Sequence, residues 1–428
     1  MRRDKNMDKK QEIQDEVQLI QDLFDGIDNG DFNNFGETSD KYTFKYLKAI
    51  WDLQTVLDGG KELYKQIYEI AIKCGIRHVQ QKYKTGRKIK VAFLTISAAE
   101  WPAESVYRLL KMNENVEAYL VVGPLIDRSV ENMEDAFEKT ASFFEKRGYD
   151  VRRAYDSKNK KVRLWEEIGK PDIVIHLTHW YKSLPEEYQI ENYPFTILNC
   201  YIPYAMSLAD NAKGTFMINS SNNSMFLNMM WHIYTDTMYH YEGYREYQLL
   251  GGENVVFTGF PKMDFFYNKI ENTSDQLMLM ANWKYPTGCD PKNMKKVIIA
   301  PHHTFLGYGG ILYSTFQWNM YFWIYLAKKY ENQISFIFKP HPNLRTRAIE
   351  AEVFRDAGDY ERYIDLWEKL PNARVSAEES YLEIFATSDG MIMDSNSFLA
   401  EYMYVNKPLL FLTREEQTFN KLGRSIVD

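Results

Sequence analysis

From Lys88 onward the chain alternates buried strand patterns with helix patterns. KVAFLTI and VEAYLVVG are apolar stretches of strand length, and helix patterns follow them, EWPAESVYRLLKM after the first and residues 129–147 after the second. Because such strands are apolar on both faces, helices must cover both sides of their sheet. The alternation therefore predicts parallel, doubly wound α/β structure. No GxGxxG follows the first strand, which disfavours a dinucleotide site of the Rossmann type.

The alternation runs through two series of similar size, which predict two Rossmann-like domains. Residues 87–253 form the first, where PDIVIHLT and FTILNCYI supply two further strands. Residues 254–428 form the second, with strands in NVVFTGFP, KKVIIAPHHT, ISFIFKPHP, ARVS, GMIMDS and PLLFL. Helices are expected between these strands around residues 315–330, 346–356, 380–386 and 397–405. Two such domains in tandem are expected to leave a cleft that binds a small ligand.

Residues 1–86 form an α-helical N-terminal segment in which no convincing strand pattern occurs. Apolar residues recur at helical spacing in IQDEVQLIQDLF, YTFKYLKAIWDLQTVL and LYKQIYEIAIKCGI, and DGIDNGDFNNFGETSD reads as a turn-rich linker between the first two. The expected role of these helices is to pack as a small bundle or arm. An amphipathic surface for a membrane or a partner is the alternative.

Composition restricts the class of protein. A chain of 428 residues with 45% hydrophobic and 26% charged residues is globular, and a net charge of -7 argues against nonspecific nucleic-acid binding as its main task. The three cysteines lie far apart, as in a reducing compartment. The chain has no apolar signal segment at its start and no bilayer-spanning run. We therefore expect a cytoplasmic protein, either soluble or peripheral at the inner face of the cell membrane.

Polar side chains follow the strands of the second series in a consistent way. Lys262 follows VVFTGFP, His302 and His303 follow VIIAP, and Lys339 and His341 follow FIF in the rigid Lys-Pro-His-Pro turn. The carboxyl ends of parallel strands lie on one edge of a sheet, where ligands bind in open α/β folds. A single histidine in such a place is more often structural, and the Lys-Pro-His-Pro turn alone fits a stiff loop equally well.

The strand GMIM leads into the start of a helix rich in small polar residues. Asp394 follows the strand, and Ser395, Asn396 and Ser397 then offer side chains that can cap a helix N-terminus. Glu401 lies one turn beyond Ser397 and is expected to face the same ligand site. Free N–H groups and the helix dipole make such a terminus a site for anions. An ordinary strand-to-helix junction is the alternative, but together with the Lys-Pro-His-Pro turn the pattern favours a phosphate site.

These motifs resemble those of the CDP-glycerol glycerophosphotransferases, which include the teichoic-acid primases and polymerases of bacterial cell walls. The similarity rests on KPHP, on SDGMIMDSNSFLAEYMYVNKPLLFL and on Gly259 to Asp264 in VVFTGFPKMDFF, and it covers residues 254–412. Where the family usually has a Ser-Ser pair after the aspartate, this chain has Ser395 and Asn396. The resemblance implies the glycosyltransferase B architecture of two Rossmann-like domains, with the activated donor held mainly by the second.

The resemblance also implies a reaction and a set of residues. An acceptor hydroxyl of a polymer or a lipid-linked precursor would attack the glycerol-bearing phosphorus of a CDP-activated donor and expel CMP. Lys339, His341, Ser395 and Ser397 would contact the pyrophosphate, and the rest of the expected donor site comprises Lys262, Asp394, Asn396 and Glu401. The donor is a substrate, so no tightly bound cofactor and no metal site are expected. Such catalysis depends on positioning and charge stabilisation.

The identity of the general base is left open by the sequence. Many relatives have a Trp-His-Gly motif in the first domain, whereas LNCYIPYAMSLAD, Leu198 to Asp210, has no histidine. His341, His302, His303 and His179 are the candidate catalytic residues, and sequence cannot choose among them because a base needs reach before it needs a suitable pKa. His176 is a further candidate, although packing under Trp180 and Tyr181 is the more ordinary role for both His176 and His179.

Two other functions remain compatible with the sequence. One is a glycosyltransferase of the same fold that uses a nucleotide-sugar for a capsule or another surface polysaccharide, since similar strand endings occur in capsule enzymes. The other is a catalytically silent relative that serves as a scaffold. The missing first-domain histidine favours the scaffold, whereas the retained phosphate-site residues argue against it.

Overall fold

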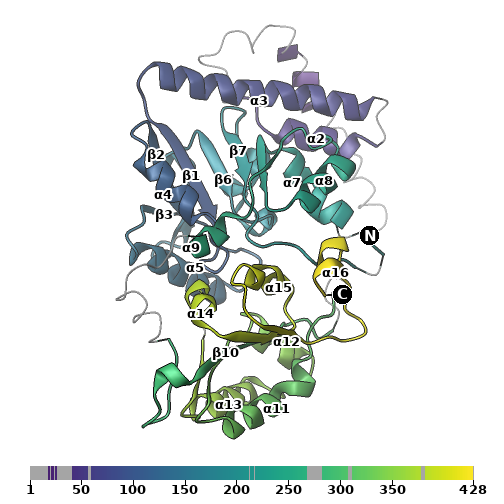
Figure 1. The fold of residues 1–428 in the computed structure, drawn as a ribbon. Coiled ribbons are helices and arrows are strands. Elements are labelled where there is room, and N and C mark those ends of the chain that lie inside the picture. Colours follow the sequence, from purple (N-terminus) through teal and green to yellow (C-terminus); the bar gives the residue numbers. More distant parts are fainter. Residues whose placement is uncertain are drawn as a thin grey trace. The chain divides into compact units, whose positions relative to one another are not determined.

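The fold is described from a computed structural model of the chain. The structure describes residues 18–19, 21–23, 25–26, 41–55, 59–211, 213–215, 217–267, 282–306, 311–376 and 381–427. Most of the first expected helix and most of the linker after it lie outside the described residues. The chain divides into two compact units, one of residues 1–204 and 222–262, the other of residues 205–221 and 263–428 (Figure 1).

The first unit is built on a parallel sheet. Among the described residues its strands run in the order β3 (Val151–Arg153), β2 (Val116–Val122), β1 (Ile89–Thr95), β6 (Ile173–His176), β7 (Leu198–Tyr201), β8 (His232–Thr235) and β9 (Val255–Phe257). The chain moves outward from β1 to β3 and then returns to β6 on the other side of β1. The junction of β1 and β6 is therefore a topological switch point, where crevices form in such folds.

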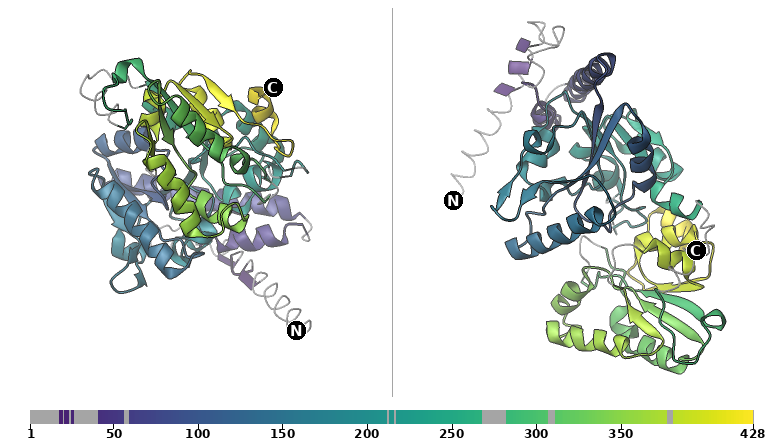
Figure 2. Two further views of the ribbon diagram at one scale, coloured as in Figure 1. Left: turned by 90° about the horizontal axis from the view of Figure 1, so that it is seen from below. Right: turned by 90° about the vertical axis from the view of Figure 1, so that its left-hand side faces the viewer.

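Helices cover both faces of this sheet (Figure 2). Ala92 and Leu94 of β1 pack into one core with α2 (Lys45–Leu53) and α3 (Gly60–Lys84). Val91 and Phe93 point the other way and pack with α4 (Glu104–Met112) and α5 (Val130–Glu145). The alternation follows from the period of two along a strand. The doubly wound arrangement predicted from the apolar strands is confirmed for this unit.

The described N-terminal helices are part of the first unit. Tyr64, Ile67 and Cys74 of α3 are buried in the same core as the sheet, and the hydroxyl of Tyr68 donates a 2.7 Å hydrogen bond to the carbonyl of Met230. Residues 59–86 therefore pack as part of the core, as expected for a packing arm. Along the described parts of the chain, no helix combines the length and apolar character needed to cross a bilayer.

One strand lies in a different sheet from the one predicted. We expected NVVFTGFP to open the second domain, but β9 pairs in parallel with β8, with Ile233 opposite Val255. The prediction that the second series begins with this strand was wrong. A strand of three residues has too little pattern to indicate which sheet it joins, and here the partner strand β8, which the sequence patterns did not single out, decides it.

The second unit has a smaller parallel sheet. Its strands run in the order β12 (Ala373–Val375), β11 (Ile334–Phe338), β10 (Lys295–Ala300), β13 (Gly390–Met393) and β14 (Leu409–Phe411). Its helices are α11 (Phe316–Lys329), α12 (Leu344–Glu350), α13 (Ala357–Glu368), α14 (Leu382–Thr387), α15 (Asn396–Met403) and α16 (Lys421–Val427). The switch point lies between β10 and β13. Two α/β units with parallel sheets are thus confirmed, and α13, which buries Tyr363 and Trp367, is an element that the sequence patterns missed.

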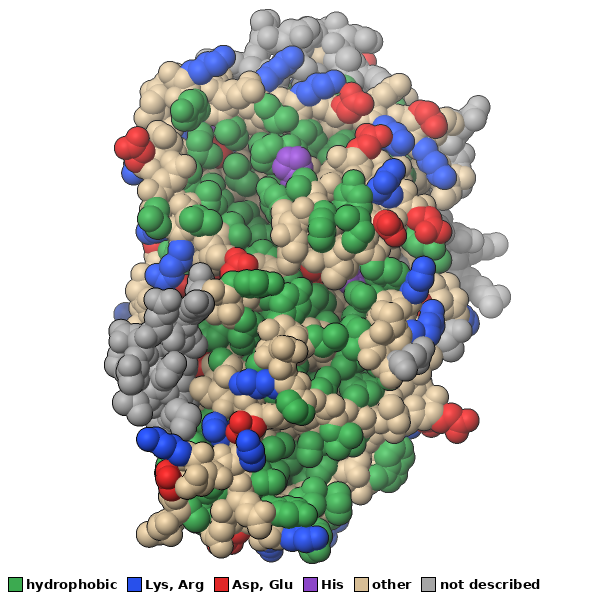
Figure 3. All heavy atoms as spheres, viewed as in Figure 1, with side chains coloured by type: hydrophobic (Ala, Val, Ile, Leu, Met, Phe, Trp, Pro, Cys, Tyr) green, Lys and Arg blue, Asp and Glu red, His purple; other side chains and the backbone are tan. Residues whose placement is uncertain are grey.

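Short elements complete the described chain. They are β4 (Tyr155–Asp156), β5 (Lys161–Val162), α6 (Trp165–Ile168), η1 (Tyr181–Ser183), η2 (Glu186–Tyr188), η3 (Ile190–Asn192), η4 (Met217–Asn222), α7 (Met225–Asn228), α8 (Met238–Tyr247), η5 (Pro261–Met263), α9 (Asp264–Tyr267) and η6 (Pro291–Asn293). On the face displayed in Figure 3, lysines and arginines are interspersed with acidic side chains among the described residues and do not merge into a broad basic surface.

Candidate functional site

The strand ends that attracted notice in the sequence meet at the switch point of the second sheet. β10 and β13 are direct neighbours, with Ala300 opposite Met393, and β11 lies on the other side of β10. The loops after these three strands carry His302 and His303, Lys339 and His341, and Asp394 with Ser395. The structure therefore brings together most of the residues predicted for the donor site.

Asp394 holds two of these loops in place. Its carboxylate is fully buried and accepts hydrogen bonds from the backbone N–H of His302, from the N–H of Thr315 and, at 2.8 Å, from the Thr315 hydroxyl. Burial raises the pKa of Asp394 to about 6, against the opposing effect of these donors. The residue positions the loop after β10 and the start of α11, and contact with a donor stays a prediction for it.

Three histidines form a cluster of rings beside this carboxylate. The rings of His303 and His341 stack with centroids 3.9 Å apart, and the centroid of His302 lies 5.6 Å from that of His341. The backbone N–H of Asn343 donates a 3.1 Å hydrogen bond to Nδ1 of His341, which leaves the proton of this imidazole on Nε2. The ring can therefore offer an N–H to an anion.

The histidine cluster is electrically neutral near pH 7. Burial, with the neighbouring histidines and Lys339, lowers the pKa of His341 well below its usual value, and burial with His303 does the same for His302. For His303, burial and Arg347 lower the pKa to about 4. Within the described parts of the chain, no group of three or more His, Cys, Asp or Glu side chains is arranged to hold a metal ion.

The start of α15 differs from the expected capped terminus. Ser395 is the N-cap residue, but its side chain makes no capping hydrogen bond, so the expectation that its hydroxyl caps the helix was wrong. The side-chain oxygen of Asn396 instead accepts a 3.1 Å hydrogen bond from the N–H of Leu208, within the same unit. Ser397 follows in the first turn. Without a side-chain cap at Ser395, backbone N–H groups at this terminus are open to an anion.

Lys339 and Glu401 are both buried. Lys339 is 8% exposed, and its own N–H donates a 2.8 Å hydrogen bond to the carbonyl of Ile299, which fixes the Lys-Pro-His-Pro turn against β10. Glu401 is 1% exposed and accepts a hydrogen bond from the hydroxyl of Tyr381. One oxygen of Glu401, the carboxylate that we expected to face the ligand, is therefore hydrogen bonded to Tyr381.

The remaining predicted residues lie in the first unit. Lys262 follows β9, is 7% exposed, and donates a 3.2 Å hydrogen bond to the carbonyl of Ala99. His179 follows β6, and burial lowers its pKa to about 4. His176 is buried in the sheet, hydrogen bonded to Asn199 at 3.1 Å. Lys262 therefore belongs to the carboxyl edge of the first sheet.

Glu100 is a residue that sequence reasoning overlooked. EWPAESVYRLLKM was read as a helix throughout, but α4 begins only at Glu104, and Glu100 lies in the loop after β1. Its Oε2 is shut off from solvent and has no hydrogen-bond partner. Pro102 was the available signal, because proline is tolerated near the first turn of a helix but the residue before it avoids helical backbone.

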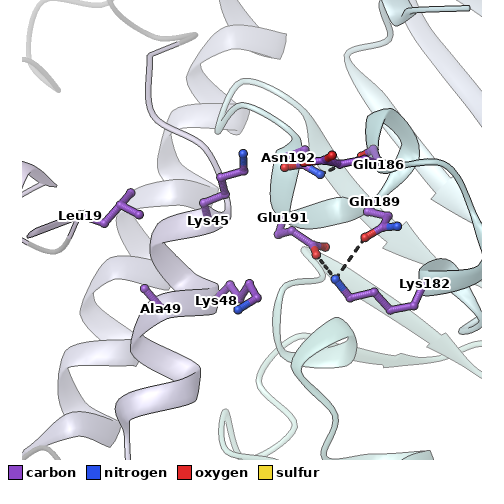
Figure 4. Close-up of a pocket in the computed structure, with 9 residues that line it drawn as sticks. All are labelled: Leu19, Lys45, Lys48, Ala49, Lys182, Glu186, Gln189, Glu191 and Asn192. Carbon is purple, nitrogen blue, oxygen red and sulfur yellow. Dashed lines mark hydrogen bonds and ion pairs between the residues drawn. The ribbon is translucent and has the colours of Figure 1, made fainter. Parts of the chain in front are cut away.

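A separate pocket lies elsewhere in the first unit (Figure 4). It has a volume of about 410 Å³ and lies between α2 and the turns η1 to η3. Lys182 in its wall pairs with Glu191 and donates a 3.1 Å hydrogen bond to Gln189. Lysines and glutamates both line it, and the residues predicted for the site do not.

Comparison with known proteins connects the C-terminal part of the chain to one family. Residues 246–428 match the family model described as CDP-Glycerol:Poly(glycerophosphate) glycerophosphotransferase. The resemblance to this family is confirmed over residues 246–428. A teichoic acid poly(ribitol-phosphate) polymerase of Bacillus spizizenii (strain ATCC 23059 / NRRL B-14472 / W23) is 26% identical over 161 residues. That match covers 38% of this chain and spans 22% of the relative's length.

Solved structures show only distant likeness. The wall teichoic acid polymerase TagF is 12% identical, with a TM-score of 0.46 over 80% of this chain and 78% of that chain. A UDP-GlcNAc 2-epimerase from Neisseria meningitidis bound to UDP-GlcNAc is 16% identical, with a TM-score of 0.41 over 77% of this chain and 83% of that chain. These scores are too low for an argument from shared structure, so the fold rests on the sheets described above.

Proposed function

We propose that this glycerophosphotransferase-family chain transfers a polyol phosphate from a CDP-activated donor to a hydroxyl of a surface polymer or its lipid-linked precursor. CMP is the other product, and the reaction takes place at the inner face of the cell membrane. The observation that carries the proposal is the coincidence of the family match with the strand-end group at the second switch point. The glycerophosphate named by the family and the ribitol phosphate named by the relative leave the polyol open.

The chemistry assigns a task to each group at this switch point. The diphosphate of the donor accepts hydrogen bonds from Nε2–H of His341 and from the free N–H groups at the start of α15. Lys339 supplies positive charge in a buried setting, where electrostatic attraction is stronger than in water. Asp394 positions the loop that carries His302 and His303.

The bonds that form and break follow from a displacement at phosphorus. The acceptor oxygen attacks the phosphorus that bears the polyol, and the bond from that phosphorus to the bridging oxygen of the diphosphate breaks. CMP departs with the negative charge, which the groups around the diphosphate stabilise. Catalysis of this kind is positioning and electrostatics, so the tightly bound cofactor that some transferases use is not required.

The test of this proposal is the nucleotide that is bound and released. Cytosine offers an exocyclic amine where uracil offers a carbonyl, so a site built for one leaves a polar group unpaired with the other. That costs about 1 to 3 kcal/mol, or about tenfold or more in affinity. Titration calorimetry with CMP, CDP, UMP and UDP should show the preference for cytosine. Turnover with CDP-glycerol, CDP-ribitol and UDP-sugars, each with and without a polyol-phosphate acceptor, should show acceptor-dependent CMP release.

Each other outcome has a defined meaning. A preference for UDP with release of UDP from a UDP-sugar would replace the proposal with the nucleotide-sugar glycosyltransferase. Binding of no nucleotide at all would favour the silent scaffold. His341→Ala serves as the control for both measurements, because specific binding at the second switch point should weaken in this variant.

A further inference from the structure

The carboxyl edge of the first sheet carries a second group of functional side chains. Each member follows a different strand: Glu100 follows β1, Arg128 follows β2, His179 follows β6, Tyr204 follows β7 and Lys262 follows β9. Glu100 and His179 flank the switch point between β1 and β6. Lys262 reaches the loop of Glu100, where its Nζ donates to the carbonyl of Ala99 at 3.2 Å. The edge on which ligands bind in such folds therefore presents a carboxylate, an imidazole, a phenol and two cations.

Within this group, Glu100 has a side-chain environment that a purely structural role does not explain. Its Oε2 is inaccessible to solvent and accepts no hydrogen bond, although the residue as a whole is partly exposed. Glu104, one turn further along the chain, is the contrast. It accepts hydrogen bonds from Nε1 of Trp101 at 2.9 Å, from Nε of Arg108 at 2.6 Å and from the hydroxyl of Tyr149.

A buried carboxylate oxygen without a hydrogen-bond partner destabilises the fold, so the stability of the fold does not explain why such a residue is present. Leaving such a group without a partner costs about 1 to 3 kcal/mol or more when it is charged. Such groups call for an explanation, and a role in catalysis or ligand binding is one of the usual ones. At the mouth of a switch point, a hydroxyl of a bound ligand is the partner that this oxygen lacks.

The charges around Glu100 suit a group that gains and loses a proton. Burial raises the pKa of Glu100 to about 7, while Lys262 and Arg128 oppose the rise. The phenols of Tyr204 and Tyr201 are the other titratable groups near it, and burial keeps both of them neutral. The pKa of His179 is lowered to about 4 by burial. Because the strength of a base follows its pKa, Glu100 is the stronger base of the two at neutral pH.

We propose that Glu100 is the general base that accepts the proton of the acceptor hydroxyl, at a site formed by the carboxyl edge of the first sheet. This inference rests on the proposed function, because it assigns the base for that reaction. As the acceptor oxygen bonds to phosphorus, its proton moves to the carboxylate of Glu100, which returns it to solvent after CMP has left. Lys262 stabilises the carboxylate in its ionised form. The assignment also accounts for a chain that has no histidine between Leu198 and Asp210.

The test compares Glu100→Gln with the wild-type chain across pH. In the wild type, kcat/KM for the acceptor should rise with pH through about 7 and then level off, since the ionised carboxylate is the active form. Glu100→Gln should lower kcat by about 100-fold or more, the usual contribution of a general base, and should remove that limb. KM for the CDP-activated donor should stay within about threefold, because donor contacts are assigned to the second unit.

Two further variants keep the test decisive. Glu191→Gln neutralises another buried carboxylate of the same unit that also has an unpartnered Oε2, and it should leave the pH profile unchanged. Glu100→Asp retains a carboxylate on a shorter side chain, so partial activity with a retained pH limb is expected, even if Glu100→Gln folds poorly. Activity of folded Glu100→Gln close to wild type, or a wild-type limb near pH 4 as His179 would give, would overturn the proposal.

A measurement without turnover separates this inference from the proposed function. Asp394, with a pKa of about 6, contributes a carboxylic acid band to an infrared difference spectrum between pH 6 and pH 8, and Asp394→Asn identifies that band. The spectrum should contain a second such band, that of Glu100, which disappears at the higher pH and is absent in Glu100→Gln. If the wild-type chain turns over no CDP-activated donor while this band titrates, the proposed reaction fails and Glu100 remains a proton-exchanging group in need of another substrate. If the band is missing, Glu100 is not the base, whatever the reaction.

Discussion

The backbone N–H of His302 donates a hydrogen bond to Oδ1 of Asp394, and this contact joins the ends of β10 and β13 across the second switch point. The other oxygen of the same carboxylate accepts from the N–H and the hydroxyl of Thr315, at the start of α11. These three donors need a side chain whose two oxygens both accept hydrogen bonds, which a carboxylate provides. The carboxylate therefore determines the position of the loop that carries the histidine pair.

Asp394→Asn should lower both stability and nucleotide binding. The amide of Asn presents an N–H to a site lined with donors, so one donor loses its acceptor at a cost of about 1 to 3 kcal/mol in the free energy of unfolding. Urea unfolding and titration with CDP measure the two effects. Asp389→Asn is the matched control, because Asp389 joins β13 to the N–H of Lys296 at the opposite edge of the sheet. If Asp394→Asn bound CDP as the wild type does, the loop would not depend on this contact.

His341→Ala should reduce turnover while leaving the fold intact. If its Nε2–H stabilises the diphosphate, turnover should fall by about two orders of magnitude, as on loss of one stabilising donor. Thermal unfolding and turnover are measured on the same preparation. His78→Ala, at the amino edge of the first sheet, is the control for loss of a histidine. A lower melting temperature with unchanged activity per folded molecule would instead assign His341 a role in stiffening its loop.

Binding of a nucleoside diphosphate should take up protons. His302, His303 and His341 have lowered pKa values in the free chain, and an adjacent diphosphate raises the pKa of an imidazole by favouring its cationic form. Proton uptake should therefore increase as the pH falls from 8 to 6. Calorimetry of CDP binding in buffers with different ionisation enthalpies measures it, with cytidine as the control that lacks phosphate. A binding enthalpy independent of the buffer would place the diphosphate away from the three rings.

Much of this arrangement was predictable because strand direction is encoded locally. The apolar runs before His302, Lys339 and Asp394 are strands, and since these strands are parallel, their polar ends meet at one edge. The same reasoning placed His179 at a strand end of the first unit. Whether a segment is a helix or a strand, and which residues follow the carboxyl ends of parallel strands, depend on patterns a few residues long. Such patterns can be read directly from a sequence.

The errors concern partners that are distant along the chain. The carboxylate of Asp394 accepts a hydrogen bond from Thr315, 79 residues before it, and no local sequence pattern indicates that pairing. Lys262 was assigned to the second series because its strand precedes that series in sequence, but the strand pairs with β8. Glu100 was hidden in an apparent helix, and its unpartnered oxygen appears only when every neighbouring donor is known. Whether a buried polar group has hydrogen-bond partners depends on the three-dimensional structure. Here it distinguishes Asp394, which has partners and positions a loop, from Glu100, whose Oε2 has none.

The last prediction concerns α3, which packs closely against the first sheet. A Cβ added at Gly75 would lie 2.5 Å from Cδ2 of Leu198 in β7 and 3.2 Å from the carbonyl oxygen of Phe195. Gly75→Ala should therefore lower the free energy of unfolding by about 1 to 3 kcal/mol, the usual cost of overpacking, despite the better helix propensity of alanine. Urea unfolding followed by tryptophan fluorescence measures it. Gln80→Ala, at an exposed position of the same helix, should change stability little.

A double-mutant cycle identifies the contact responsible for this effect. Leu198→Ala removes the side chain that the new methyl group would strike, so Gly75→Ala should cost less in that background than in the wild type, with a coupling of about 0.5 kcal/mol or more. Binding of CDP should survive in the folded fraction of each variant, because its contacts are assigned to the second unit. Additive effects of the two substitutions would mean that α3 accommodates the methyl group by moving away from β7. In that case residues 59–86 would be a loosely attached arm, and the alternative of a membrane or partner surface would regain weight.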